Sequence, residues 1–468
     1  MIDIKLLREN PDRFRTGAAN KGYDPAKVDA LLELDKPVRA LMTRLQDLTA
    51  EKNRIGKEIG QIAGKMKKAP PEVQAELQRQ MAALQQRPTQ IKVEEQQLSQ
   101  QLAEMEAKRD ALLLELPQPA DDDVPVGRGS DDNVEISRWS PAPGSERSFD
   151  PAKPFAAQRG FEPKSHIELM TKLGMVDFDR GTKISGSRSY VLVGDGMRLH
   201  QAILRYAFDM MINENGFTPL SVADLVRHEM MVGTGFFPSG REQVYDISNP
   251  TGDYGLALTG TGEVGLMGFH ADEIIDGATL PRCYTTLSTC FRREAGSAGK
   301  DTAGLYRIHQ FDKIEQVVIC KADETESRMW HRKMMGFVET LLRRLELPYR
   351  LLQCCTGDLG PKNADMVDIE CWMPSRGTPA PGSDGKPTGA FGETHSASRL
   401  YDYQCRRLNI RYKDAETGKN VVAHSLNNTV AASPRILIPI MEMYQNEDGS
   451  ITVPTVLRAQ MGGKERIG

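Results

Sequence analysis

The chain has 468 residues, of which 26% are charged and 39% hydrophobic, and its formal net charge is −4. This length predicts two or three domains, one of them large. No apolar run approaches the roughly 20 residues that span a bilayer, and the first residues do not form a signal peptide. We therefore expect a soluble, cytoplasmic protein that does not contact membranes, on which any surface for nucleic acid is local.

Seven cysteines are scattered through the second half of the chain, and no two of them form a Cys-x-x-Cys pair. An odd number of cysteines with this spacing argues against a disulfide framework and against a zinc cage. No Gly-Lys-Ser or Gly-Lys-Thr loop occurs either, which excludes a P-loop nucleotide site. We expect reduced thiols and no zinc.

The first quarter of the chain predicts a long helical arm. Between Leu31 and Met66 apolar residues recur at alternating intervals of three and four, which is the heptad spacing of a coiled coil. A second series follows from Val73 to Leu116, after a break at residues 67–71 that contains two prolines. Two long helices joined by a short turn are therefore expected to form an antiparallel hairpin over about residues 28–113.

The charges and prolines of this arm add detail. Lys and Arg outnumber Asp and Glu by 13 to 10 between residues 38 and 113, although the whole chain is acidic. Pro37 predicts a helix start or a kink, and Pro88 predicts a kink in the returning helix. On its own, such an arm is most often a dimerisation coiled coil with a solvated charged face.

Residues 117–160 are rich in Pro, Asp, Gly and Ser, which predicts a linker leading into the next domain. The remainder, residues 161–468, combines short strand-like runs, amphipathic helices and glycine-punctuated turns. This pattern predicts an α+β domain built on a mainly antiparallel sheet with flanking helices. Residues 199–213 and 326–347 are the clearest of these helices.

The stretch from Cys290 to Glu315 predicts a β-hairpin suited to a polyanion. Arg292, Arg293 and Glu294 lie together on its first arm, the middle contains three glycines, and the return arm alternates polar and apolar residues. Arginine binds phosphate through two parallel hydrogen bonds. Taken alone, arginines on a hairpin more often form a solvated edge.

The whole stretch closely resembles motif 2 of class II aminoacyl-tRNA synthetases, in the form found in seryl-tRNA synthetases, where Phe-Arg-x-Glu precedes a loop and His-Gln-Phe-x-Lys-x-Glu. The chain also resembles this family around motif 1, at about residues 196–226, and motif 3, at about residues 425–443. The resemblance implies a class II catalytic domain over residues 161–468 and a tRNA-binding domain over residues 1–116. It further implies a homodimer that uses ATP and Mg²⁺.

The resemblance also assigns functional residues. The catalytic residues would be Arg292, Glu294 and Arg435. Serine would be bound by Thr261, Gly262, Glu263, Arg292, Glu315, Asn427 and Thr429. ATP would be bound by Arg292, Arg293, Glu294, Ile308, Phe311, Glu393, Thr394, His395, Ser396 and Arg435. Mg²⁺ would be held through ATP by Glu393 and Ser396, whose oxygens are the hard ligands it prefers. tRNA would contact the arm at Lys65, Lys67 and Lys68.

Some of these residues would recognise particular parts of the substrates. Glu263 would pair with the ammonium group of serine, together with Thr261. Glu315 would hold the serine hydroxyl, and a buried carboxylate in that role rejects alanine, which leaves it unpaired. Phe311 would stack on adenine. For His395 we expect an ordinary hydrogen-bonding role.

The sequence departs from the family pattern at several places. The usual proline of motif 1 is absent at Val222, and Ala303 stands where the motif 2 loop usually has an arginine. Gly262 and Gly265 stand where the family more often has a larger residue and a proline, which predicts a looser serine-binding loop. Residues 378–390 are rich in Pro and Gly and form an insertion, which we expect to be a surface loop.

Together these features predict an enzyme that attaches L-serine to tRNA(Ser) through a seryl-adenylate, and that serves tRNA(Sec) as well. Two alternatives remain. A diverged relative could activate serine and pass it to a carrier protein or a small amine, but the basic arm argues against this because such a protein needs no tRNA clamp. A catalytically inactive RNA-binding protein is disfavoured because the chain retains Arg292, Glu294, Glu315, Glu393 and Arg435.

Overall fold

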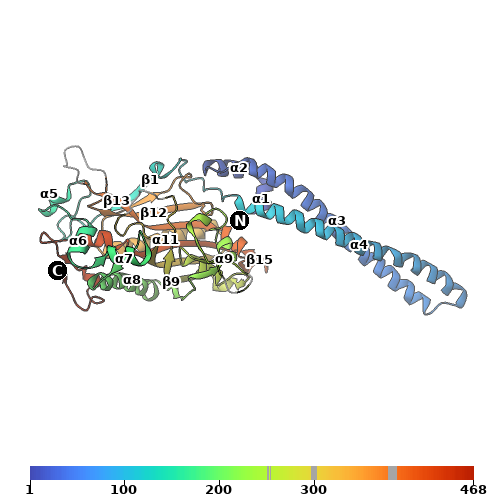
Figure 1. The fold of residues 1–468 in the computed structure, drawn as a ribbon. Coiled ribbons are helices and arrows are strands. Elements are labelled where there is room, and N and C mark those ends of the chain that lie inside the picture. Colours follow the sequence, from blue (N-terminus) through green and yellow to red (C-terminus); the bar gives the residue numbers. More distant parts are fainter. Residues whose placement is uncertain (250–251, 253, 297–302, 378–386) are drawn as a thin grey trace. The chain divides into compact units, whose positions relative to one another are not determined.

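The computed structural model describes residues 1–249, 252, 254–296, 303–377 and 387–468 (Figure 1). The chain divides into two units. The arm unit consists of residues 4–15 and 24–116, and the sheet unit consists of residues 1–3, 16–23 and 117–468. Each unit is described by itself below.

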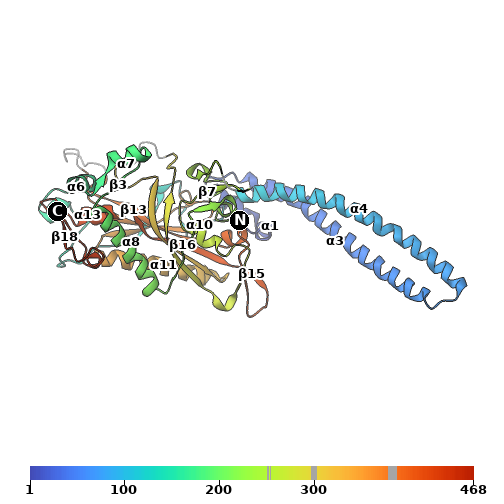
Figure 2. The ribbon, with the colours of Figure 1, turned by 60° about the horizontal axis from the view of Figure 1, so that its bottom comes forward.

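The arm unit is built on two long antiparallel helices, α3 (Ala26–Met66) and α4 (Pro71–Glu115). They run side by side in both views (Figure 1, Figure 2). Apolar side chains at heptad spacing are buried between them, among them Leu48, Ile55 and Ile91. Two shorter helices precede them, α1 (Ile4–Glu9) and α2 (Pro11–Asn20), of which residues 16–20 of α2 belong to the sheet unit. The predicted two-helix arm is confirmed.

Prolines and lysines mark the details of this arm. Pro37 and Pro88 both lie inside the helices, so neither marks a helix end. The connection falls at residues 67–70, and α4 starts at a proline, whose missing N–H is not needed in the first turn. Lys65, Lys67 and Lys68 are exposed at this connection.

The sheet unit is centred on an eight-stranded sheet. In spatial order its strands are β1 (Val134–Trp139), β11 (Tyr349–Gln353), β12 (Asp365–Met373), β13 (Ala390–Tyr401), β16 (His424–Ser433), β10 (Gln310–Cys320), β9 (Arg282–Phe291) and β4 (Thr218–Pro219). All neighbouring strands are antiparallel except β4 and β9, which are parallel. The predicted α+β fold on a mainly antiparallel sheet is confirmed.

Helices cover one face of this sheet. α8 (Asp195–Asn213) and α11 (Glu324–Arg344) lie against it (Figure 2) and share a core with Val318 and Leu426 of the strands. Because successive side chains of a strand alternate between faces, the residues next to these point the other way. The opposite face is therefore available for the polar side chains of a site.

Shorter elements complete the sheet unit. Its other helices include α5 (Phe155–Arg159), α6 (His166–Lys172), α7 (Phe178–Ser185), α9 (His228–Gly233), α10 (Glu263–Gly268), α12 (Tyr403–Arg407) and α13 (Leu437–Met443). Small sheets are formed by β5 (Leu225–Arg227), β7 (Leu256–Leu258) and β6 (Tyr245–Asp246), by β15 (Asn420–Val422), β14 (Arg411–Lys413) and β8 (Ile274–Asp276), by β2 (Val176–Asp177) and β3 (Val191–Leu192), and by β17 (Ile451–Thr452) and β18 (Arg466–Ile467).

The structure refines the sequence analysis in several places. The segment 117–160 contributes β1 to the edge of the large sheet. The return arm of the hairpin is a strand only from Gln310, and residues 305–309 before it belong to no strand. Pro434 precedes α13 and does not lie in its first turn, because the helix starts at Leu437. Of the insertion, residues 378–386 lie outside the described residues. None of the described helices is long and apolar enough to cross a membrane.

Two departures from the family pattern meet in space. A Cβ on Gly265 would lie 2.6 Å from the Cβ of Val222, so the valine that replaces the motif 1 proline packs directly on this glycine. A Cβ on Gly262 would lie 2.4 Å from Cγ2 of Thr286. Both glycines permit close packing of a largely buried segment, which argues against the looser loop that their small size suggested.

Substitution of two other glycines by alanine tests how closely the helices of the sheet unit are packed. A Cβ on Gly196 in α8 would lie 2.2 Å from the carbonyl oxygen of Met175, whereas nothing lies within 4 Å of a Cβ on Gly336 in α11. We expect Gly196→Ala to lower the free energy of unfolding by about 2 kcal/mol, because it overpacks a backbone contact. Gly336→Ala should raise it by roughly 0.5–1 kcal/mol, because alanine restricts the unfolded chain. Urea unfolding followed by circular dichroism measures both, and equal effects would contradict this packing.

Candidate active site

A cavity of about 510 Å³ opens beside the hairpin of β9 and β10. Its lining includes Arg292, Glu294, Glu393 and Arg435. A smaller cavity shares these four side chains and adds others, including Ile308, Phe311, Lys313, Thr394, His395 and Thr429. Segments that are far apart in the sequence, and that the sequence analysis singled out, therefore meet at one place.

The hairpin positions Arg292 through its backbone. The N–H of Arg292 donates to the carbonyl of His309 at 2.9 Å, directly beyond the last paired residues of β9 and β10. The next turn is fixed by Gln243, whose side-chain amide donates to the carbonyl of Ala295 at 2.7 Å. The guanidinium of Arg292 lies over the ring of Phe311, 5.3 Å from its centre. The guanidinium of Arg292 and the ring of Phe311 are thus held together where β9 ends and β10 begins.

Two more arginines surround Tyr306. The guanidinium groups of Arg376 and Arg435 lie 4.0 Å and 4.6 Å from the centre of its ring. The Nε of Arg435 donates to the carbonyl of Tyr306 at 3.1 Å, and its Nη1 lies 3.5 Å from Oε2 of Glu393. With Arg292, this arrangement offers several guanidinium groups to a chain of phosphates.

Glu393 and Ser396 lie on β13, opposite Glu370 and Asp368 of β12. The hydroxyl of Ser396 donates a hydrogen bond to Asp368, and burial together with the charge of Glu393 raises the pKa of Asp368 well above its usual range. Its Oδ1 is buried and has no hydrogen-bond partner among the described residues. This set of carboxylate and hydroxyl oxygens fits Mg²⁺, which prefers hard oxygen ligands. Sequence reasoning missed Asp368, because only the pairing of the two strands places it beside Ser396.

Glu315 lies in a buried polar cluster next to the smaller cavity. Lys313, two residues before it on β10, forms an ion pair with it. The hydroxyl of Thr261 donates to Oε2 of Glu315 at 3.2 Å and accepts from Nζ of Lys313 at 2.8 Å. Burial raises the pKa of Glu315, and Lys313 opposes this effect. The cluster presents a carboxylate, an ammonium group and a hydroxyl within one small volume, which suits a small zwitterionic ligand.

Glu263 adjoins this cluster and already has several partners. Its Oε1 accepts hydrogen bonds from the side-chain amides of Asn427 at 2.6 Å and Gln404 at 2.7 Å. Lys362 donates to both oxygens, at 2.8 Å and 2.7 Å. Sequence reasoning expected Glu263 to be available for an ammonium group and missed both Gln404 and Lys362. They come from segments whose position relative to Glu263 no spacing indicates.

Arg293 and the departure at Ala303 lie apart from the cavities, whereas His395 lines the smaller one. Arg293 is exposed and lines neither of them, and Ala303 is exposed beside the part of the loop, residues 297–302, that lies outside the described residues. His395 is buried, which lowers its pKa to about 3, and its Nδ1 lies 2.8 Å from the hydroxyl of Thr394. These contacts agree with the hydrogen-bonding role that we expected for this histidine.

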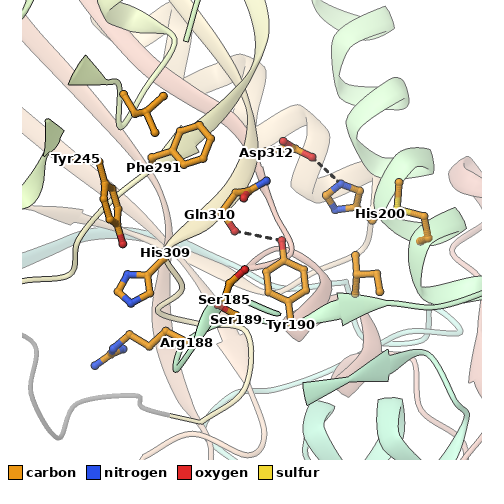
Figure 3. A pocket seen from close by; sticks show the side chains of 13 residues that line it. Ser185, Arg188, Ser189, Tyr190, His200, Tyr245, Phe291, His309, Gln310 and Asp312 are labelled. Atoms are coloured by element: carbon orange, nitrogen blue, oxygen red, sulfur yellow. Dashed lines mark hydrogen bonds and ion pairs between the residues drawn. The ribbon is translucent and has the colours of Figure 1, made fainter. Parts of the chain in front are cut away.

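The other side of β10 carries a third cavity, of about 420 Å³ (Figure 3). His200 joins two strands there, since its Nε2 lies 3.0 Å from Oδ2 of Asp312 and its Nδ1 lies 2.8 Å from the hydroxyl of Ser433. The hydroxyl of Tyr190 donates to the carbonyl of Gln310 at 3.3 Å. Tyr190 and His200 thus form hydrogen bonds to β10, and they stabilise the hairpin on the side opposite to the site.

The chain is similar to known proteins over its whole length. Residues 1–119 match the seryl-tRNA synthetase N-terminal domain, and residues 245–444 match the class II tRNA synthetase core domain (G, H, P, S and T). The serine–tRNA ligase of Deinococcus radiodurans is 40% identical over 468 residues, which cover 100% of this chain and 99% of the relative. That of Staphylococcus saprophyticus is 37% identical over 467 residues, with coverage of 100% and 99%.

Solved structures agree with this result. The seryl-tRNA synthetase of Pyrococcus horikoshii complexed with ATP matches with a TM-score of 0.80 and 37% identity, over 100% of this chain and 99% of that one. The cytoplasmic serine–tRNA ligase of Naegleria fowleri in complex with AMP matches with a TM-score of 0.79 and 29% identity, over 100% and 98%.

The arginines around Tyr306 lead to a test of anion binding. We expect Arg435→Met to weaken the binding of inorganic tripolyphosphate by about tenfold or more, because it removes charge-assisted hydrogen bonds. Arg411→Met is the control, since Arg411 is exposed on β14 and lines neither cavity. Titration calorimetry measures both affinities. An equal loss in the two variants would show that net charge, and not this cavity, binds the anion.

Proposed function

The chain belongs to the seryl-tRNA synthetase family and is a serine–tRNA ligase, and we propose that it joins L-serine to tRNA(Ser) in two steps through a seryl-adenylate. One observation carries the proposal. The arginines that line the cavity, Arg292 and Arg435, lie next to the buried cluster of Lys313, Glu315 and Thr261. A polyphosphate and a small zwitterion bound at these two places would have their reacting groups side by side.

In the first step, an oxygen of the serine carboxylate attacks the α-phosphorus of ATP, and the bond to the β-phosphate breaks to release pyrophosphate. Arg292 and Arg435 stabilise the charge that develops on the phosphates. Phe311 supports the adenine and Glu294 hydrogen-bonds to it. Mg²⁺, held by Glu393 and Ser396 with Asp368 nearby, would neutralise phosphate charge when bound.

In the second step, a hydroxyl of the terminal adenosine of tRNA attacks the carbonyl carbon of the adenylate, and AMP leaves. No side chain has to act as a nucleophile, so orientation of the reactants carries much of the rate. Glu315 and Thr429 hold the serine side chain while this exchange takes place. The same reaction would extend to tRNA(Sec), if the arm recognises the features that the two tRNAs share.

Exposed apolar side chains support the assembly that we propose. Met197 and Leu225 of the motif 1 segment, and Val193 next to it, are large apolar side chains with more than two fifths of their surface exposed. Exposed apolar residues on such a segment support a homodimer through this face. We propose that the reaction takes place in the cytoplasm, where tRNA is charged.

Serine-dependent exchange between ATP and pyrophosphate tests the proposal, because it reports formation of the adenylate without tRNA. We expect exchange with L-serine and not with L-alanine. Arg292→Ala should reduce the exchange rate by about a hundredfold, because it removes the cation nearest to the transferring phosphate. The absence of serine-dependent exchange in the wild-type protein would overturn the enzyme assignment.

The role of Glu315 can be separated from that of the ATP residues. We expect Glu315→Ala to raise the KM for serine by about ten- to a hundredfold, because a hydrogen bond to a charged group contributes about 1.5–3 kcal/mol. The KM for ATP should change by less than about twofold, since Glu315 lines neither cavity at the phosphate side. Exchange kinetics measure both values. A parallel rise of the two would contradict the assignment of Glu315 to the serine hydroxyl.

Substitution of the lysines of the arm tests whether serine is transferred to tRNA or to another acceptor. We expect the triple change Lys65→Ala, Lys67→Ala and Lys68→Ala to raise the KM for tRNA several-fold and to reduce its salt dependence, because phosphate contacts are lost. Serine-dependent exchange in the same variant is the control and should be unchanged. If tRNA charging were equally unchanged, the arm would not be the tRNA clamp.

A further inference from the structure

Lys362 forms an ion pair with Glu263, whose carboxylate would bind the ammonium group of serine in the proposed function. It lies in the loop between β11 and β12, outside every motif described above. Its Nζ contacts both oxygens of Glu263, and 13% of its side chain and 4% of that of Glu263 are exposed. A lysine ammonium and the α-ammonium of an amino acid are chemically alike. The position that a serine ammonium would take is therefore occupied in the structure.

Neutral donors also hold the carboxylate of Glu263. Gln404 donates to it and also to the carbonyl of Thr234 at 2.9 Å, and Gln404 itself accepts from the hydroxyl of Ser425 at 2.9 Å. Asn427, on the same strand as Ser425, supplies the other amide. These neutral donors orient the carboxylate but do not cancel its charge. Among the described residues, Lys362 is the cation paired with Glu263.

Each carboxylate of this cluster is already paired with an ammonium group. Glu315 is already paired with Lys313, so the cluster contains two carboxylates and two ammonium groups. The side chains of Glu315 and Glu263 are nearly buried, at 2% and 4% exposed. A buried charge without a partner is strongly unfavourable, and like charges at short distance oppose each other. An incoming ammonium group can therefore reach Glu263 only after that of Lys362 has left.

In the same position Lys362 has a second partner, the ring of Phe236. Its Nζ is 4.2 Å from the centre of the ring of Phe236, and Phe236 lines the cavity of about 510 Å³. The face of an aromatic ring attracts an ammonium group, and the four-carbon lysine stem is flexible. The side chain can therefore turn from the carboxylate toward the cavity while it keeps contact with the ring.

We propose that Lys362 is an internal competitor for the amino-acid site, whose ammonium neutralises Glu263 in the empty enzyme and is exchanged for the ammonium of serine. This inference rests on the proposed function. Lys362 then sets the affinity for serine, because only the fraction of molecules in which it has left Glu263 can bind substrate. Its ammonium also contacts both oxygens of the carboxylate before serine arrives.

The test removes the competing charge and keeps the shape of the side chain. Lys362→Met retains an unbranched apolar stem over Phe236, and Lys362→Arg retains the charge. We expect Lys362→Met to lower both the KM for serine in exchange and the Kd for serine in calorimetry by about fivefold or more, with the KM for ATP within about twofold of the wild type. Lys362→Arg should bind serine no more tightly than the wild type.

Glycerate, which has a hydroxyl in place of the ammonium of serine, separates competition from a general loosening of the site. Its inhibition constant should be the same for the wild type and Lys362→Met, because glycerate does not compete with Lys362. A higher KM for serine in Lys362→Met, or a parallel change for glycerate, would overturn the inference and make Lys362 a structural residue.

Two outcomes separate this inference from its premise. If the wild-type protein neither binds serine nor catalyses serine-dependent exchange, the proposed function fails and this inference fails with it. If the wild type is active and only the fall in KM is missing, the inference alone fails. Thermal melting checks folding, and Lys362→Gln replaces Lys362→Met if the latter is unfolded. Failure of both variants to fold would assign Lys362 to stability and overturn the proposal.

Discussion

The candidate site depends on β-bulges in the large sheet, which interrupt the regular alternation of side chains between its two faces. Between Ile314 and Glu315 the pairing of β10 with β16 shifts by one residue, so that Glu315 lies opposite Thr429. A slip of one residue exchanges the two faces of a strand. Because of the shift, Thr429 and Ala432, which are three residues apart, both face the smaller cavity.

The same device explains the spacing of Glu393 and Ser396. In a regular strand, residues three apart point to opposite faces. The pairing of β12 with β13 shifts between Ile369 and Glu370, so that Glu393 lies opposite Glu370 and Ser396 lies opposite Asp368. Both side chains then reach the same face. In two of the segments that the family resemblance singled out, site residues are therefore three positions apart, and the bulge brings them to the same face of the sheet.

The sequence was sufficient for the features that repeat or that form contiguous motifs. Heptad spacing predicted the arm, and the motif from Cys290 to Glu315 predicted the hairpin, because both depend on local order. Asp368, Gln404 and Lys362 were missed, because their importance comes from strand register and from a loop that approaches Glu263 from elsewhere in the chain. The absent proline at Val222 also has a physical explanation that a single position cannot reveal, since the valine packs on Gly265.

The position of Arg292 over Phe311 has a consequence for how a nucleotide binds. In the proposed reaction the base needs the ring and the α-phosphate needs the guanidinium, but in the structure these two groups contact each other. A phosphate that draws the arginine away uncovers the ring, and a base on the ring turns the arginine toward the phosphate. The proposed reaction therefore implies that the base and the α-phosphate of the nucleotide bind cooperatively, so that the affinities of adenosine and of inorganic phosphate measured separately would not add up to that of AMP.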